Sequence, residues 1–135
     1  MNITEEHRIL RSDSPEIATQ FQLEQVTHDF DLNCAILAND KGELLYASDA
    51  YDLLFYKVLA EASPALSLGN VNQTQWSKLN LYKSIQKESI SSRSFFAGGD
   101  RYHIVAIGDA PTWREIGIFR AIRGLQRILK IEDDE

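Results

Sequence analysis

NCAILANDKGELLYASDAYDLLFYKVLAEA, residues 33–62, is the stretch that decides the fold. It begins with Cys34–Ala38, a short apolar run without Gly or Pro, which is typical of a buried strand. Residues 39–42 then form a turn, because Asn and Asp side chains bond their own backbone and Gly42 accepts a positive φ. Residues 43–47 are mostly apolar again, so the two strands should form a hairpin.

The second half of this stretch, residues 50–62, has the spacing of an amphipathic helix. Its apolar residues recur at intervals of three and four, which places them on one helical face. These residues are Tyr51, Leu54, Phe55, Val58, Leu59 and Ala62. Pro64 should end or kink the helix, because proline lacks the backbone donor. We expect the apolar face to pack across the sheet.

Outward from this unit, the remaining elements follow from local patterns. Residues 14–28 begin with Ser-Pro-Glu, a favourable helix start, and residues 112–131 form the last helix. Leucine and isoleucine alternate with polar residues over 78–85, which predicts a strand. Residues 88–96 and 101–107 surround a Gly-Gly turn and predict a hairpin.

The order α-β-β-α-β-β-β-α predicts a single α+β domain with a five-stranded antiparallel sheet. A chain of 135 residues fits one domain. We assign residues 1–13 to a flexible N-terminal arm, residues 14–131 to the folded domain and residues 132–135 to an acidic tail.

Composition narrows the class of protein. Apolar residues make up 44% and charged residues 25% of the chain, as in ordinary globular domains. No apolar run is long enough to insert in a membrane, and the N-terminus does not resemble a signal peptide. A single cysteine, Cys34, excludes a disulfide scaffold, so we expect a cytoplasmic protein. We interpret Cys34 itself as a small buried hydrophobe. A net charge of −6 argues against nucleic-acid binding.

Catalytic and cofactor motifs are missing from the sequence. His7, His28 and His103 fall on different expected elements, and none has a neighbour at metal-ligand spacing. Gly98-Gly99 is too short for a phosphate loop, and no Lys-Ser or Lys-Thr follows it. We therefore expect no cofactor, no metal and no enzymatic activity, which favours an interaction module.

The last helix carries a basic stripe formed by Arg120, Arg123 and Arg127, at i, i+3 and i+7. Residues 1–52, by contrast, hold eleven acidic side chains against three basic ones. Such asymmetry can orient a partner, and it also occurs on solvated helix faces. Both interpretations of the stripe stay open at this point.

The element order resembles that of the Roadblock superfamily, which includes dynein light chains, Ragulator-type scaffolds and the bacterial partner of the gliding-motility GTPase. Three stretches carry the resemblance. Cys34–Ser48 is similar to the family's opening hairpin, Tyr102–Asp109 to its last strand and Trp113–Leu129 to its closing helix. The chain departs from the family pattern at Pro64 and in the polar residues 65–77.

The resemblance implies a Roadblock/profilin-like, non-catalytic homodimer that scaffolds or regulates a small Ras-like GTPase. In such dimers the second helix and third strand meet at the dyad, which corresponds here to residues 50–62 and 78–85. The exposed candidates for that dimer and partner surface are Lys57, Trp76 and Lys83. Two alternatives remain: a secretion-type chaperone that binds an extended client segment, suggested by the acidic charge, and a GAF- or PAS-like small-ligand sensor.

Overall fold

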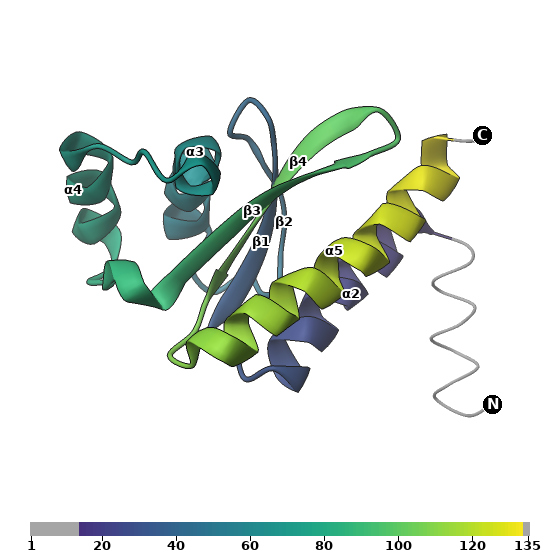
Figure 1. Cartoon of the computed structure of the whole chain (residues 1–135), viewed down its shortest axis with the longest axis horizontal. Coiled ribbons are helices and arrows are strands. Elements are labelled where there is room, and N and C mark those ends of the chain that lie inside the picture. Colours follow the sequence, from purple (N-terminus) through teal and green to yellow (C-terminus); the bar gives the residue numbers. More distant parts are fainter. Residues whose placement is uncertain (1–13, 134–135) are drawn as a thin grey trace.

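The computed structural model describes residues 14–133, with side chains as far as Leu129, so the expected arm at 1–13 lies outside the described part. Figure 1 labels the helices and strands. In chain order they are α2 (Pro15–Asp29), β1 (Cys34–Asn39), β2 (Leu44–Ala47), α3 (Leu53–Leu68), α4 (Gln73–Tyr82), the 3₁₀ turn η1 (Lys87–Ser89), β3 (Ile90–Ala97), β4 (Asp100–Ile107) and α5 (Pro111–Asp133). Because α5 runs to Asp133, the first half of the expected acidic tail belongs to this helix.

The strands form one antiparallel sheet with the order β2-β1-β4-β3. Ile36 in β1 lies opposite Val105 in β4, and Ile107 in β4 lies opposite Ile90 in β3. The two central strands are buried along most of their length, whereas β2 and β3 are the edges. The first strand is thus the continuous apolar run that its sequence predicts.

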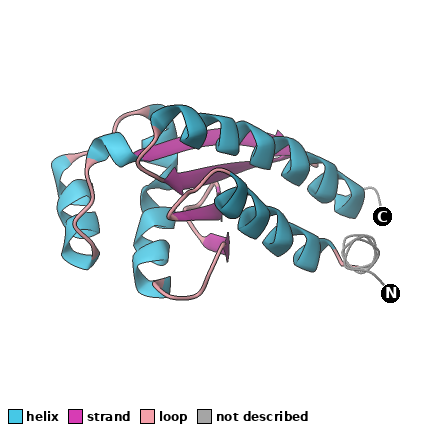
Figure 2. Ribbon diagram, turned by 90° about the horizontal axis from the view of Figure 1, so that it is seen from below, coloured by secondary structure: helices cyan, strands magenta, loops and turns pink. Residues whose placement is uncertain are grey.

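Helices cover both faces of the sheet (Figure 2). On one face α2 and α5 pack beside each other, and on the other face α3 lies across the strands with α4 against it. Each face has its own hydrophobic core. The core under α2 and α5 includes Leu23, Leu37, Ile104, Ile118 and Leu125, and the core under α3 includes Ile36, Phe55, Leu59, Leu79 and Val105.

The turn between β1 and β2 forms as its sequence predicts. The side-chain oxygen of Asn39 accepts hydrogen bonds from the backbone N–H groups of Lys41 (3.0 Å) and Glu43 (2.9 Å). Gly42 has a φ of +81°, and a Cβ there would lie 3.2 Å from the Cα of Glu61 in α3. Glycine therefore allows both the turn and its close approach to the helix.

The fifth strand expected at residues 78–85 is wrong, because α4 occupies most of this segment. Asn72 and Gln75 form a reciprocal capping box that starts the helix. Leu79 then points into the core, while Leu81 remains 84% exposed. The helix places Leu79 and Leu81 on different sides, so that only Leu79 is buried. A strand would place both leucines on the same face.

Pro64 does not end the second predicted helix, because α3 continues through it to Leu68. Proline cannot donate to the carbonyl four residues earlier, which belongs to Ala60. The hydroxyl of Ser63 donates to that oxygen instead, at 2.7 Å. This local replacement explains why the helix tolerates a proline in its interior.

The predicted apolar face of α3 is confirmed only in part. Phe55, Val58, Leu59 and Ala62 are buried against the sheet. Tyr51 lies before the helix and is 92% exposed, and Leu54 in its first turn is 68% exposed. The sheet thus buries the middle of the helix and leaves two members of the predicted face, Tyr51 and Leu54, in solvent.

Candidate interaction surfaces

The six residues that the sequence singles out lie on two separate surfaces. Lys57, Trp76 and Lys83 belong to α3, α4 and the residue that ends α4, on one face of the sheet. Arg120, Arg123 and Arg127 belong to α5, on the opposite face (Figure 1). We call these the α3–α4 surface and the arginine surface. A partner as small as a single helix cannot contact both at once.

Two of the three candidates on the α3–α4 surface hold the domain's own structure. The amine of Lys83 lies 3.4 Å from a carboxylate oxygen of Asp52 and 5.9 Å from the centre of the Phe55 ring. Trp76 is half-buried at the edge of the core, and the amine of Lys87 lies 5.1 Å from its ring centre. These contacts bind α4 to α3 and to the 3₁₀ turn η1, which precedes β3.

Lys57 is exposed on α3, and it makes no ion pair with the part of the chain that the structure describes. Exposed apolar side chains lie at the ends of the two helices that the Lys83–Asp52 pair joins. These side chains are Tyr51, Leu54, Leu81 and Tyr82. Gathered apolar groups in solvent are typical of a protein contact. The surface is therefore apolar with an unpaired lysine beside it.

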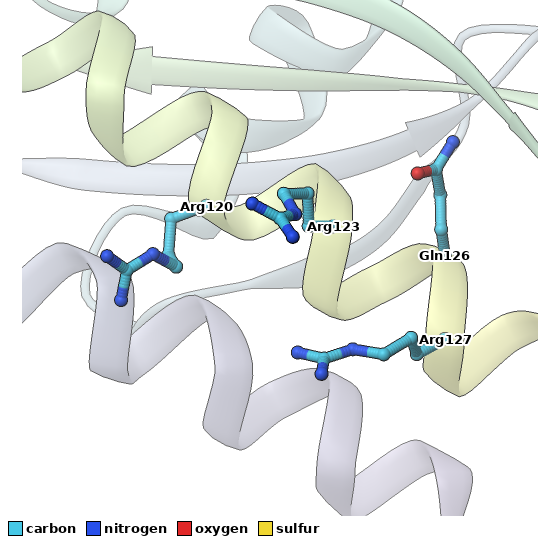
Figure 3. A pocket seen from close by; sticks show the side chains of 4 residues that line it. All are labelled: Arg120, Arg123, Gln126 and Arg127. Atoms are coloured by element: carbon cyan, nitrogen blue, oxygen red, sulfur yellow. The ribbon is translucent and has the colours of Figure 1, made fainter.

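The arginine surface contains a hollow of about 570 Å³. It is lined by Arg120, Arg123, Gln126 and Arg127. In Figure 3, Arg120 and Arg127 extend from α5 toward α2, Arg123 lies between them, and Gln126 points to the other side of the helix. The amide of Gln126 donates to the carbonyl of Phe96 in β3 at 3.0 Å. The three guanidinium groups thus share one side of the helix.

Close packing of α2 against α5 forms the base of this surface. A Cβ at Gly124 would lie 2.3 Å from the amide nitrogen of Gln22 in α2. The same amide nitrogen donates to the backbone carbonyl of Arg120 at 3.3 Å. The glycine lets the two helices approach, and the glutamine fixes their spacing beneath the arginines. This contact explains why α5 carries a glycine at position 124.

The charges of the three arginines are not neutralised within the described residues. No carboxylate of residues 14–129 lies within 4.0 Å of the guanidinium nitrogens of Arg120, Arg123 or Arg127. Arg120 has one directed contact, its guanidinium carbon lying 5.7 Å from the centre of the Phe30 ring. That cation–π contact orients Arg120 and leaves its hydrogen-bond donors available.

A chain of polar side chains that the sequence does not reveal lies between α3 and the sheet. His103 is buried in β4, and its Nε2 lies 2.7 Å from a carboxylate oxygen of Asp40. Its Nδ1 lies 2.9 Å from the hydroxyl of Ser67, which lies 2.9 Å from the hydroxyl of Ser92. These residues come from a turn, a helix end and two strands, so no sequence spacing connects them. Both ring nitrogens of His103 thus have a polar partner inside the domain.

Carboxylate, imidazole and hydroxyl thus stand in the order found in hydrolases. Ser67, however, lies in the last turn of α3, where a helix presents carbonyl groups. An oxyanion needs N–H donors, and the N–H of the following Gly69 already bonds to the carbonyl of Leu66. The arrangement is suited to joining the β1–β2 turn, α3 and β3 around His103, and not to acyl transfer at Ser67.

Cys34 is unsuited to nucleophilic chemistry. Burial, assisted by the negative charge of Asp49, raises the pKa of its thiol to about 12. The thiol therefore carries almost no reactive thiolate at neutral pH. The prediction of a small buried hydrophobe is confirmed.

Two further features bear on function. Among residues 14–133, no helix combines the length and the apolar character needed to cross a bilayer. Within the same range, no group of three or more His, Cys, Asp or Glu side chains is arranged to hold a metal ion.

Comparison with known proteins identifies the fold. No family model matches the sequence, and no curated protein matches it either. The solved structure of Myxococcus xanthus MglB is similar, with a TM-score of 0.58, 13% sequence identity, and coverage of 86% of this chain and 90% of that chain. Likeness at this identity concerns the backbone arrangement alone. The chain therefore has a Roadblock-type fold, with four strands among residues 14–133 where the sequence predicts five.

Proposed function

We propose that the protein is a non-catalytic interaction module that scaffolds or regulates a small Ras-like GTPase in the cytoplasm. The observation that carries this proposal is the Roadblock-type fold, which extends over 86% of the chain. The family resemblance described above associates that fold with binding of small GTPases. Regulation by a scaffold needs an exposed contact surface and no substrate pocket.

A non-catalytic role is supported by the state of the candidate nucleophiles. Cys34 is buried with a raised pKa, and Ser67 lies in the last turn of α3, where a helix presents carbonyl groups. His103 is held between Asp40 and Ser67 inside the domain. Each of these groups takes part in packing or in internal hydrogen bonds.

We also propose that the protein is a homodimer that pairs through the α3–α4 surface. The absence of a strand at residues 78–85 excludes the joining of two sheets through that segment. The exposed Tyr51, Leu54 and Leu81 offer an apolar alternative, because dimerisation would remove them from water. Lys57 lies on the same helix as Leu54 and would sit at the rim, where charged residues are common.

Sedimentation equilibrium tests the dimer. We expect a dimer for the unaltered protein, and a folded monomer for the double variant Leu54→Asp, Leu81→Asp. Lys41→Asp is the control, because Lys41 is exposed in the β1–β2 turn and belongs to neither α3 nor α4. A monomer at high micromolar concentration, or a double variant that stays dimeric, would exclude this contact.

Partner binding is tested by affinity purification from cells that naturally make the protein. A small GTPase should co-purify, and it should be lost when Lys57→Glu is used as bait while Lys41→Glu still retains it. Recovery of unfolded client chains, with no GTPase, would instead favour the chaperone alternative.

A further inference from the structure

The solvent side of α5 combines an apolar half and a basic half. Trp113 and Ile116 lie in its N-terminal part and are 55% and 43% exposed. Arg120, Arg123 and Arg127 follow in its C-terminal part and are exposed as well. At about 100° per residue, these five positions fall within an arc of roughly 80°. They form one continuous stripe, about 21 Å long at 1.5 Å per residue.

The basic half has the properties of a binding site for an anion. Three guanidinium groups share a hollow of about 570 Å³, and none has a carboxylate partner among residues 14–129. This concentration of positive charge lies on a chain whose net charge is −6. The Gln22–Gly124 contact beneath holds α2 and α5 together, so the arginines extend from a fixed base.

We propose that this stripe binds an acidic and apolar segment of a partner protein. Carboxylates placed about one helical turn apart would each form a bidentate pair with a guanidinium group. Apolar side chains next to them in the segment would cover Trp113 and Ile116. The inference rests on the proposed role as an interaction module, and it names a second contact on the face opposite to the α3–α4 surface.

Two other occupants fit the stripe less well. A second copy of α5, paired antiparallel about the midpoint of the stripe, would bring Arg120 against its own copy. An anionic bilayer would have to approach α2, which lies beside α5 and exposes Glu16, Glu24 and Asp29. Those charges repel a negative membrane surface. A peptide segment can follow α5 alone.

Selection from a random 16-residue peptide display library tests the chemistry without knowledge of the partner. The immobilised full-length protein is the bait. We expect enriched peptides that carry Asp or Glu at intervals of three or four residues, flanked by apolar or aromatic residues. Absence of enrichment, or a consensus without acidic residues, would overturn the proposal.

The location is tested with the strongest selected peptide, synthesised with a fluorescent label. Arg123→Glu with Arg127→Glu should weaken its binding at least about tenfold, because charge pairs are replaced by repulsion. Among the described residues neither arginine forms a hydrogen bond, an ion pair or a ring contact, so the thermal unfolding temperature should change little. Lys41→Glu with Arg101→Glu is the charge-matched control on the β-turns and should retain the affinity.

Two further measurements are the salt dependence of peptide binding and the binding of lipid vesicles. Raising NaCl from 50 to 500 mM should weaken peptide binding by the unaltered protein and have little effect on the double arginine variant. Equal affinity in both double variants would overturn the proposal. So would arginine-dependent binding to phosphatidylserine vesicles that the peptide does not displace. If the peptide binds while no GTPase co-purifies, the proposed contact on α5 stands and the proposed function fails. If a GTPase co-purifies while no peptide binds, the proposed function stands and the contact on α5 fails.

Discussion

Gly42 satisfies two requirements at one residue. Its positive φ suits glycine, and its missing Cβ lets the β1–β2 turn contact the backbone of α3 at Glu61. Gly99 has a similar φ of +88° but open space around it. Both positions thus need a residue that accepts a positive φ, and only Gly42 also needs the space that a missing Cβ leaves.

Gly42→Ala should lower the free energy of unfolding by more than Gly99→Ala does. Both substitutions incur the cost of a left-handed alanine, about 1–2 kcal/mol, and Gly42→Ala also pushes a Cβ against the helix backbone, which cannot turn aside. Urea unfolding of the two variants provides the comparison. Equal losses would show that the contact with α3 is looser than described.

Cys34 gives a prediction about pH. Its pKa is raised to about 12, so the folded protein should react negligibly with a disulfide reagent at pH 8, where an ordinary thiol near pKa 8.5 reacts readily. Because the raised pKa disfavours the thiolate in the folded state, the stability that this shift contributes is complete below about pH 8.5 and declines as the pH rises toward about 12. Absorbance of the released thiolate product measures the reaction. Rapid modification without denaturant would contradict the burial.

At the scale of the element, two residues on the predicted apolar face of α3 differ in burial. Val58→Asp should unfold the protein, because Val58 is 7% exposed and a charge there would be buried without a partner. Leu54→Asp should remain folded, since Leu54 is 68% exposed in the first turn. Circular dichroism shows whether each variant is folded. A folded Val58→Asp protein would place the buried face of α3 elsewhere.

The helix α4 is tested by a second pair of leucines. Leu79→Asp should destabilise by several kcal/mol, because Leu79 is buried under α3, whereas Leu81→Asp should leave stability almost unchanged. A strand at residues 78–85 would place both side chains on one face, and both substitutions would then be costly. Thermal unfolding distinguishes the two outcomes.

These elements show which parts of the fold were within reach of the sequence. The β1–β2 hairpin, α2 and α5 were predictable because caps, turn residues and apolar spacing agree locally. The helix α4 was not predictable from residues 78–85 alone. The apolar spacing there resembles a strand, and the capping box that starts the helix lies earlier in the chain. The continuation of α3 past Pro64 depends on one hydroxyl, that of Ser63.

For the candidate surfaces, the sequence predicted which charged residues are exposed but not which side chains they contact. The arginine stripe followed from helical spacing alone, and the structure places its three members together. The internal contacts of Lys83 and Trp76 were not predictable, since their partners Asp52 and Lys87 come from separate parts of the chain. The His103 network escaped notice for the same reason, because burial joins four distant segments.

At the scale of the whole molecule, two unlike surfaces lie on opposite faces of one sheet. The α3–α4 surface is apolar, with Lys57 beside it, and the arginine surface is basic and half apolar. Such a division lets one protein pair with its own copy on one face and contact other proteins on the other. A scaffold needs this separation, whereas an enzyme needs groups that converge on one site.

The most direct measurement is an equilibrium titration of the protein with the co-purified GTPase loaded with GDP or with a non-hydrolysable GTP analogue. The account predicts saturable binding whose affinity differs at least about tenfold between the two nucleotide states, corresponding to roughly 1.4 kcal/mol. Undetectable binding of both forms at high micromolar concentration would contradict it, and equal affinity would reduce the role to tethering.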